Sequence, residues 1–449
     1  MAETQDLAQV QQYIAGLVER ARKAQGRIEL ATQEQVDEMC TRVAWAGVRP
    51  DFAQKYVEHC AQETGMGYAP HKFMKQMTKV KGALRDLKGK KSVGVVEHDK
   101  ENGIMKIAKP IGVIGALLPV TNGEATPFVK AIFAIKTRNA VIMAPHPKAQ
   151  KTNDQAMAQI RGVLKKHGWP EDLVIGIEAT TLDKSKELIK QVDLILATGG
   201  GPMVKAAYSS GKPAHGVGAG NALIIVDETA DLKDAADKIM RSKTFDHATS
   251  CSTENALAIQ ESVYDKMIKE LEAAGGYLCS AEEKAKLQKG MWDEKGALNR
   301  EIVAQPAEKI AKVAGINLPK GKSFLMVEET GIGKGFPFSA EKLSVTMTLY
   351  KYKEFSEAID LVNRITAHSG PGHSCGIHTV NELRIRELSH KVRVSRIMVR
   401  QPQCLTNSGA WTNGMPMSTT LGCGTWVSYP IPSTQPSDLE LFGSIMYED

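Results

Sequence analysis

The sequence predicts an α/β fold in which helices cover a parallel sheet on both faces. From Ile111 onward, short apolar runs alternate with amphipathic segments of helical length, which is the order expected of parallel strands joined by crossover helices. The chain has 449 residues, too many for one ordinary hydrophobic core, so we expect two or three domains. With 42% hydrophobic and 24% charged residues, its composition is that of a globular protein.

The segment up to about residue 90 predicts a layer of helices. Apolar side chains recur at helical spacing from Leu7 to Ala21, and similar patterns follow in 33–46 and 52–63. The first amphipathic helix could pack on the core or serve as a docking tag for an assembly, because one apolar face suits either role.

Residues 91–109 predict a β-hairpin. The apolar-alternating runs SVGVVEH and IMKIAK lie on either side of the turn-prone sequence DKENG. Because the hairpin stands outside the main alternation, we interpret it as an arm for contact between subunits.

The alternation then predicts an ordered series of strands and helices. The expected strands are 111–118, 140–144, 173–177, 194–197 and 222–226, and the expected helices are 151–166, 182–191 and 231–243. A second alternating block begins with strand 256–260 and helix 262–274 and continues to about Val399, before a loop rich in Gly, Thr, Ser and Asn at 407–424.

Charge and cysteine usage narrow the class of protein. The net charge of +6 suits a phosphorylated small molecule as well as a nucleic acid, but no nucleic-acid motif is present. The longest apolar run, 111–120, is about half of a membrane-spanning helix, and the polar N-terminus does not resemble a secretory signal. The seven cysteines are scattered without a C-x-x-C pair. We therefore expect a cytoplasmic protein that binds no nucleic acid, membrane or structural metal.

Cys251 is the first candidate for chemistry. A cysteine that only packs usually has large apolar neighbours, whereas Cys251 is flanked by Thr249, Ser250, Ser252 and Thr253. Cysteine attacks as a thiolate, and small neighbours allow a substrate carbon to approach. One cysteine is a weak signal, so these residues alone leave nucleophile and bystander equally open.

Two strand ends could bind a cofactor. LILATGGG places Thr198, Gly199 and Gly200 between a strand and a helix, where backbone amides attract phosphate. VIMAPHPK places His146 and Lys148 after a strand, at the edge of a parallel sheet where ligands bind. Because the spacing is not G-x-G-x-x-G, a tight turn and a solvated loop remain the alternatives.

Several motifs follow one another in a specific order: PVTN ending at Asn122, ATGG at 197–200, GVGAGN at 216–221, the Cys251 segment, and TTLGCGTW at 419–426. Together they resemble the CoA-acylating branch of the aldehyde dehydrogenase superfamily, most strongly from 111 to 426. The resemblance implies a Rossmann-like cofactor domain at 1–240 with the hairpin arm at 91–109, a catalytic α/β domain at 241–426, and an atypical tail at 427–449. The arm would join subunits into homodimers or homotetramers.

The resemblance also assigns roles to single residues. Cys251 matches the nucleophile, and Asn122 matches the side-chain donor of the oxyanion hole. The implied cofactor is NAD or NADP, and its matched contacts are Thr198, Gly199 and Gly200 near the phosphates, His146 and Lys148 on the adenosine-ribose side, and Glu341 on the nicotinamide ribose.

The implied activity is reversible oxidation of a short-chain aldehyde to its acyl-CoA, through a thiohemiacetal and a thioester on Cys251. Hydrolytic members of the superfamily carry a glutamate in the stretch matched by 216–221, where GVGAGN has no acid. The thiol of coenzyme A needs less help from a base than water does. The alternatives are a hydrolytic enzyme that uses another base, such as Glu254, and an inactive assembly subunit. Succinate semialdehyde, sulfoacetaldehyde, acetaldehyde and propionaldehyde all remain open as substrates.

Other residues receive weaker assignments. Glu124 and His247 fit structural or supporting groups better than catalytic ones, His373 could line a pocket, and packing suits Cys375, Cys404 and Cys423. The tail after Trp426 contains three prolines and does not resemble the final strand of the branch, so the sequence leaves the oligomeric state open.

Overall fold

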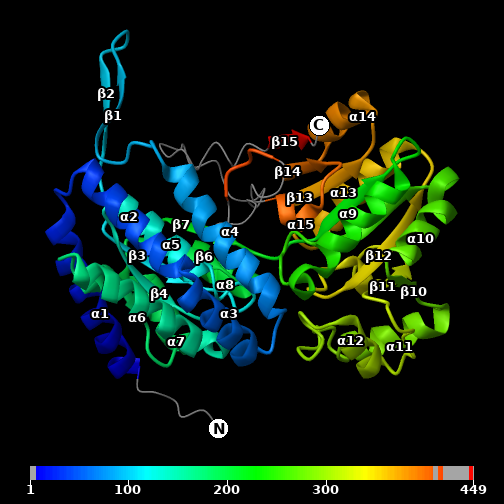
Figure 1. Ribbon diagram of the computed structural model, residues 1–449, viewed down its shortest axis with the longest axis horizontal. Coiled ribbons are helices and arrows are strands. Elements are labelled where there is room, and N and C mark those ends of the chain that lie inside the picture. Colours follow the sequence, from blue (N-terminus) through cyan, green and yellow to red (C-terminus); the bar gives the residue numbers. More distant parts are fainter. Residues whose placement is uncertain (1–6, 408–412, 418–443, 448–449) are drawn as a thin grey trace. The chain divides into compact units, whose positions relative to one another are not determined.

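The computed structural model describes residues 7–407, 413–417 and 444–447 (Figure 1). The described chain forms two compact units. The first unit holds residues 7–65, 72–217 and 417, and the second holds residues 66–71, 218–407, 413–416 and 444–447. In the part of the chain that the structure describes, no helix is both long and apolar enough to cross a membrane.

The first unit begins with the predicted helical layer, which is confirmed. Its helices are α1 (Leu7–Ile28), α2 (Gln33–Val48), α3 (Pro50–Thr64) and α4 (Ala69–Leu87). A capping box at Thr32 starts α2, and Gly65, with a φ of 65°, ends α3. Ile14 and Leu17 on α1 are buried in the core of this unit, which favours core packing over a docking tag.

The sheet of the first unit has five parallel strands in the order β5-β4-β3-β6-β7. Its strands are β3 (Val113–Leu117), β4 (Ala140–Ala144), β5 (Val174–Gly176), β6 (Leu194–Thr198) and β7 (Ala214–Val217), and its helices are α5 (Thr126–Lys136), α6 (Gln150–Lys166), α7 (Leu182–Gln191) and α8 (Gly201–Tyr208). The four strands predicted up to residue 197 are confirmed. The sequence did not predict β7, because AHGV is short and contains His and Gly.

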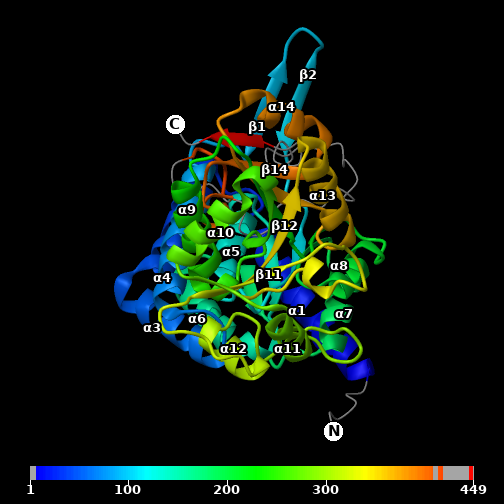
Figure 2. The same cartoon turned by 90° about the vertical axis from the view of Figure 1, so that its right-hand side faces the viewer.

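The predicted hairpin is also confirmed. Strands β1 (Gly94–Asp99) and β2 (Ile104–Ala108) pair antiparallel and project from the first unit (Figures 1 and 2). Ile104, Met105 and Ile107 expose half or slightly more of their surface. The role of this arm in subunit contact remains a prediction.

The second unit contains an eight-stranded parallel sheet in the order β10-β11-β12-β9-β8-β13-β14-β15. Its strands are β8 (Ala222–Val226), β9 (Glu254–Gln260), β10 (Gly276–Leu278), β11 (Phe324–Glu328), β12 (Thr346–Tyr352), β13 (Gly372–His378), β14 (Val394–Val399) and β15 (Ser444–Tyr447). Its helices are α9 (Leu232–Thr244), α10 (Tyr264–Ala273), α11 (Ala281–Met291), α12 (Ala307–Ala314), α13 (Phe355–His368), α14 (Glu382–Lys391) and α15 (Gln403–Thr406). The second alternating block is thereby confirmed.

Strand pairing places β8 in the sheet of the second unit, although it precedes residue 240. The functional division of the chain into 1–240 and 241–426 remains a prediction. Of the tail at 427–449, the structure describes 444–447, which pair with β14 as β15. The motif at 419–426 lies outside the described residues.

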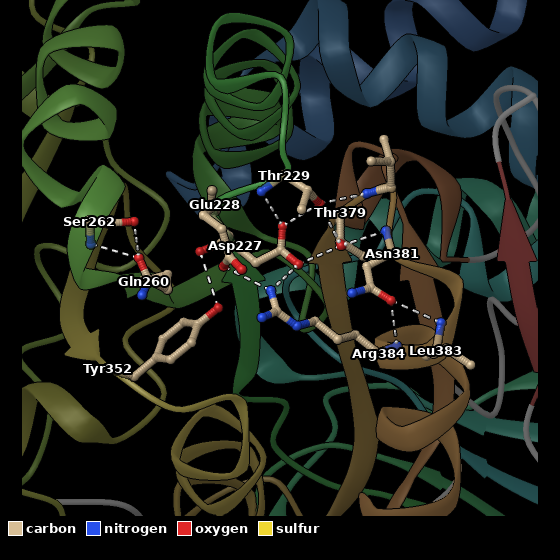
Figure 3. A network of polar contacts seen from close by, with 12 residues as sticks. Asp227, Glu228, Thr229, Gln260, Ser262, Tyr352, Thr379, Asn381, Leu383 and Arg384 are labelled. Carbon is tan, nitrogen blue, oxygen red and sulfur yellow. Dashed lines mark hydrogen bonds and ion pairs between the residues drawn. The ribbon is translucent and has the colours of Figure 1, made fainter.

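A polar network joins the carboxyl ends of β8 and β13 (Figure 3). The Arg384 guanidinium donates to Asp227 Oδ2 and Glu228 Oε2, both at 2.8 Å. The Thr229 hydroxyl donates to Asp227 Oδ1 at 2.7 Å, and Thr379 also donates to this carboxylate. These bonds hold the two strands in register, and the opposite ends of the same strands carry the site described next.

Candidate active site

The amino ends of four adjacent strands bring the candidate catalytic residues of the second unit to one sheet edge. Strands β12, β9, β8 and β13 are neighbours and parallel, so the segments that precede them share an edge. Those segments carry Glu341 before β12, Cys251 before β9 and Gly220 before β8, and His373 is the second residue of β13. Sequence order separates these residues, and sheet order brings them together.

A strained loop presents Cys251. Residues 246–248, none of them glycine, have φ values of 50°, 49° and 62°, and each such conformation costs about 1 to 3 kcal/mol. Asp246 fixes the turn, because its carboxylate accepts hydrogen bonds from Tyr68 N at 2.7 Å and from the Thr249 hydroxyl at 2.6 Å. The surrounding contacts therefore fix the loop conformation that holds the sulfur. The ring of His247 lies 5.9 Å from that of Tyr68, which fits the supporting role expected for it.

Accessibility distinguishes Cys251 from the other described cysteines. Of the six cysteines in the described part of the chain, all free, Cys251 is the only one that is not buried. Burial raises the pKa of the Cys40, Cys60 and Cys279 thiols to about 12, and it raises that of Cys375 as well. These buried cysteines therefore remain thiols at neutral pH, which suits packing.

His373 lies beside the candidate nucleophile. Its Nε2 is 3.1 Å from Cys251 Sγ, within hydrogen-bond reach of sulfur, and its Nδ1 is 2.9 Å from the Ser374 hydroxyl. The sequence offered His373 only as a residue that could line a pocket. No local pattern could have paired it with Cys251, because the two residues are 122 positions apart.

Position 220 must be glycine because its backbone lies very close to that of Cys251. A Cβ at this position would lie 2.0 Å from the Cys251 carbonyl oxygen and 3.0 Å from His373 Nε2. No side chain fits there without moving the loop. Gly220 of the GVGAGN motif therefore allows the backbone to come close to Cys251 and fix its position.

Glu341 reaches the same edge. The Gly220 N–H donates to Glu341 Oε1 at 2.8 Å, and burial raises the pKa of this carboxyl to about 7. Two side-chain amides hold the segment that carries Glu341. Asn221 Nδ2 donates to Ser339 O at 2.8 Å, and Asn255 Nδ2 donates to Ala340 O at 2.8 Å. The small cavity at this edge is lined by Gly220, Lys243, Ala248, Ser250, Cys251, Thr253, Asn255, Glu341, Leu343 and Ser344.

Glu254 is already engaged by neighbouring groups. It is 1% exposed, and its carboxylate accepts hydrogen bonds from the Ser242 hydroxyl at 2.6 Å and from Gln403 N at 3.0 Å. Burial raises the pKa of its carboxyl group and lowers the pKa of the neighbouring Lys243 ammonium group. Because both oxygens of Glu254 are used, the residue is a poor candidate for a base that activates water.

The candidate residues of the first unit lie at the carboxyl edge of its sheet. Strands β4, β3 and β6 are adjacent and parallel, so their carboxyl ends share one edge. His146 and Asn122 follow β4 and β3, and Thr198 is the last residue of β6. The carbonyl oxygen of Asn122 accepts from the Thr126 hydroxyl at 2.7 Å, and its side-chain amide donates to Thr121 Oγ1 at 3.3 Å.

The glycines after β6 leave room for a ligand. A Cβ at Gly199 would meet nothing closer than 3.9 Å, and one at Gly200 nothing closer than 4.0 Å, so packing does not require glycine at either position. The turn leads into the amino end of α8, where free N–H groups attract phosphate. After β4, His146 and Lys148 are exposed, and His146 Nδ1 accepts from Lys148 N at 3.1 Å. The role of these positions in binding a cofactor stays a prediction.

Two further residues of the first unit take structural roles. Glu124 is fully buried and pairs with the ammonium groups of Lys72 at 3.5 Å and Lys75 at 3.0 Å. A Cβ at Gly216 would lie 2.7 Å from Val204 Cγ1 and 2.8 Å from Tyr208 Cε2. The first position of GVGAGN therefore has no space for a glutamate.

Comparison with known proteins adds independent findings. The model of the aldehyde dehydrogenase family matches residues 8–286. The chain is 44% identical to the sulfoacetaldehyde dehydrogenase of an Acholeplasma species, over 97% of this chain and 94% of that one. It is 45% identical to the acylating sulfoacetaldehyde dehydrogenase of Bilophila wadsworthia, over 91% and 89%. The crystal structure of an acetylating aldehyde dehydrogenase from Geobacillus thermoglucosidasius is similar at 36% identity and a TM-score of 0.89, over 94% of this chain and 93% of that one.

Proposed function

The chain belongs to the aldehyde dehydrogenase family, in its CoA-acylating branch, and from this membership we propose that it oxidises a short-chain aldehyde to the acyl-CoA with NAD or NADP. The family and fold that the motifs predicted are confirmed. One observation carries the proposal: Cys251, the accessible cysteine of the described chain, lines a small cavity, and its Sγ lies 3.1 Å from His373 Nε2.

Cys251 is the nucleophile in this proposal. Its thiolate sulfur bonds to the aldehyde carbon, and the carbonyl electron pair moves to oxygen; Asn122, which matches the oxyanion-hole donor of the family, would donate a hydrogen bond to this oxyanion. The oxyanion collapses, hydride leaves the carbon, and a thioester on Cys251 remains. The nicotinamide cofactor, when bound, accepts the hydride.

Coenzyme A completes the reaction. Its sulfur attacks the thioester carbon, the acyl-CoA forms, and Cys251 leaves as a thiolate while the proton of the CoA thiol passes to solvent. Every bond made is matched by one broken, and the aldehyde is oxidised by two electrons. The reverse sequence reduces an acyl-CoA.

Transfer to CoA is favoured over hydrolysis by two features of the chain. Gly216 has no space for a side chain, and Glu254 is buried with both oxygens accepting hydrogen bonds. Water needs a base to become a nucleophile, whereas the pKa of a thiol is much closer to neutral pH. Thiolysis is thus the step that these residues support.

For the cofactor, we propose the contacts that the resemblance implies. Thr198, Gly199 and Gly200 would hold its phosphates, and His146 and Lys148 would hold the adenosine ribose. Glu341, whose Oε1 accepts from the Gly220 N–H, would hold the nicotinamide ribose.

For the substrate, we propose sulfoacetaldehyde first, because two of the relatives above carry that name at 44% and 45% identity. We also propose that the hairpin of β1 and β2 joins subunits into homodimers or homotetramers and that the enzyme works in the cytoplasm. The exposed apolar residues of the hairpin support the first of these two proposals.

The test is NADH or NADPH formation from each aldehyde, with and without CoA, using the intact chain and Cys251→Ala as the control. We expect reduced cofactor and acyl-CoA to appear only when CoA is present. Equal cofactor reduction without CoA would show a hydrolytic enzyme. No reduction with any aldehyde, together with slow alkylation of Cys251, would show an inactive subunit.

A further inference from the structure

A chain of hydrogen bonds continues from the far side of the His373 ring. His373 Nδ1 lies 2.9 Å from Ser374 Oγ, and Gln403 Nε2 donates to the same hydroxyl oxygen at 3.1 Å. Ser374 and Gln403 are each 0% exposed. Water therefore does not compete for the Ser374 hydroxyl, and its proton must find a partner within the protein.

The direction of the chain follows from the donors and acceptors. The Ser374 oxygen accepts from the Gln403 amide, and the remaining partner of the hydroxyl proton is His373 Nδ1. A neutral imidazole that accepts at Nδ1 carries its proton on Nε2. That N–H then points at Cys251 Sγ, 3.1 Å away.

Backbone hydrogen bonds fix the position of Gln403 in the chain. Its backbone N–H donates to Glu254 Oε1 at 3.0 Å, and the N–H of the next residue, Cys404, donates to the Ser242 hydroxyl at 2.8 Å. A Cβ at Gly376 would lie 2.6 Å from Gln403 Oε1, so the absence of a side chain there makes room for the amide. The buried Glu254 thus holds the backbone of Gln403, the last residue in this series of hydrogen bonds.

We propose that Ser374 and Gln403 are positioning residues that hold His373 in the tautomer whose Nε2–H donates to the sulfur of Cys251. The inference rests on the proposed role of Cys251 as nucleophile. His373 then stabilises the thiolate by a hydrogen bond at two stages, before attack on the aldehyde and again when Cys251 leaves from the thioester. In this arrangement, His373 acts as a donor to sulfur, and the proton of the partly exposed Cys251 thiol passes to solvent rather than to the imidazole.

Other titratable groups near the sulfur remain constant in the test. Glu341 from the segment before β12 and Lys243 from α9 line the same cavity, and Glu254 lies at the start of β9. None of them is altered in the variants below, so a change in the pH profile reports on the hydrogen-bonded chain.

The experiment measures the rate of Cys251 alkylation by iodoacetamide as a function of pH in the full-length enzyme. Ser374→Ala removes the donor to Nδ1, and the loss of one hydrogen bond predicts a rise of about 0.5 to 1 unit in the pH midpoint and an alkylation rate about threefold to tenfold lower at pH 7. Ser374→Thr keeps the hydroxyl and should restore the wild-type midpoint. Gln403→Met removes the outer link and should shift the midpoint in the same direction by a smaller amount.

Ser395→Ala is the matched control. Its buried hydroxyl donates to the backbone carbonyl of His373 at 2.7 Å but does not contact the ring, so its loss should leave the midpoint unchanged. A Ser374→Ala midpoint equal to that of the wild type, or shifted no more than that of Ser395→Ala, would overturn the proposal. If Ser374→Ala fails to fold, the Gln403→Met profile decides by the same criterion.

A direct measurement of the tautomer completes the test. In enzyme with ¹⁵N-labelled histidine, we expect His373 to show a protonated Nε2 and an unprotonated Nδ1, with the resonance assigned by its loss in His373→Asn. A protonated Nδ1 would mean that the Gln403 amide faces Ser374 with its oxygen, and this result would overturn the proposal. Both readouts use the sulfur and the ring rather than turnover, so they can succeed or fail independently of the proposed reaction.

Discussion

Gly220→Ala tests whether the short distance between the backbones of Gly220 and Cys251 fixes the position of the nucleophile. The added Cβ would lie 2.0 Å from the Cys251 carbonyl oxygen and 2.7 Å from its carbonyl carbon, whereas an ordinary contact begins at 3.4 Å. The difference of 3.4 minus 2.0 requires a displacement of about 1.4 Å. Both clashing atoms belong to the backbone of the strained loop, so no flexible side chain can relieve the contact by turning aside.

Such a displacement should affect chemistry more than folding. Moving a reacting group by about 1 Å costs on the order of a hundredfold in rate, and overpacking costs about 1 to 3 kcal/mol of stability. We expect kcat for CoA-dependent aldehyde oxidation to fall about a hundredfold in Gly220→Ala, while the protein remains folded. The alkylation rate of Cys251 should change as well, because the sulfur moves relative to His373.

Gly218→Ala is the control for this prediction. It lies in the same motif, and a Cβ there would meet nothing within 4 Å. We expect its kcat to stay within about twofold of the wild type, since an open site adds no strain. If Gly220→Ala kept more than half of the wild-type kcat, the contact with Cys251 would not be what excludes side chains from position 220, and our account of the loop would be wrong.

Three further predictions concern the site and its surroundings. Cys251→Ala should lose all CoA-dependent oxidation while retaining binding of NAD or NADP, measured by protein fluorescence; normal turnover in the folded variant would refute the nucleophile assignment. Burial raises the pKa of Glu341 from 4.5 to about 7. Between these pH values the folded state holds a proton that the unfolded state releases. The contribution of Glu341 to the free energy of unfolding should therefore fall by roughly 1 to 3 kcal/mol as the pH rises from about 4.5 to 7. In denaturant titrations, the free energy of unfolding of the wild type relative to that of Glu341→Gln should fall by this amount over the same pH range; a constant difference would contradict the prediction. Gly216→Glu should destabilise the protein by about 1 to 3 kcal/mol or more through its clash with Val204 and Tyr208, and it should not create CoA-independent oxidation; the appearance of carboxylic acid product without CoA would contradict the steric argument.

Local patterns determined the elements of this fold. Apolar periodicity placed β4 and α7 at the bounds seen in the structure, because a strand or helix that packs on a core must repeat its apolar residues at its own period. The small and polar neighbours of Cys251 marked it as accessible, and the ordered motifs identified the family before any geometry was known. Both signals are carried by neighbouring residues, so the sequence holds them directly.

Only the tertiary structure decided which residues meet. His373 reaches Cys251 across 122 positions because β9, β8 and β13 are neighbours in the sheet. The same strand order places β8 in the second unit. Glu254, at the start of β9, accepts hydrogen bonds from Ser242 and Gln403, which lie on other elements of the fold. Periodicity reports which face of an element is buried but not which element covers it. The order of parallel strands is set by the packing of the whole chain, and in this protein that order decides which groups surround the sulfur.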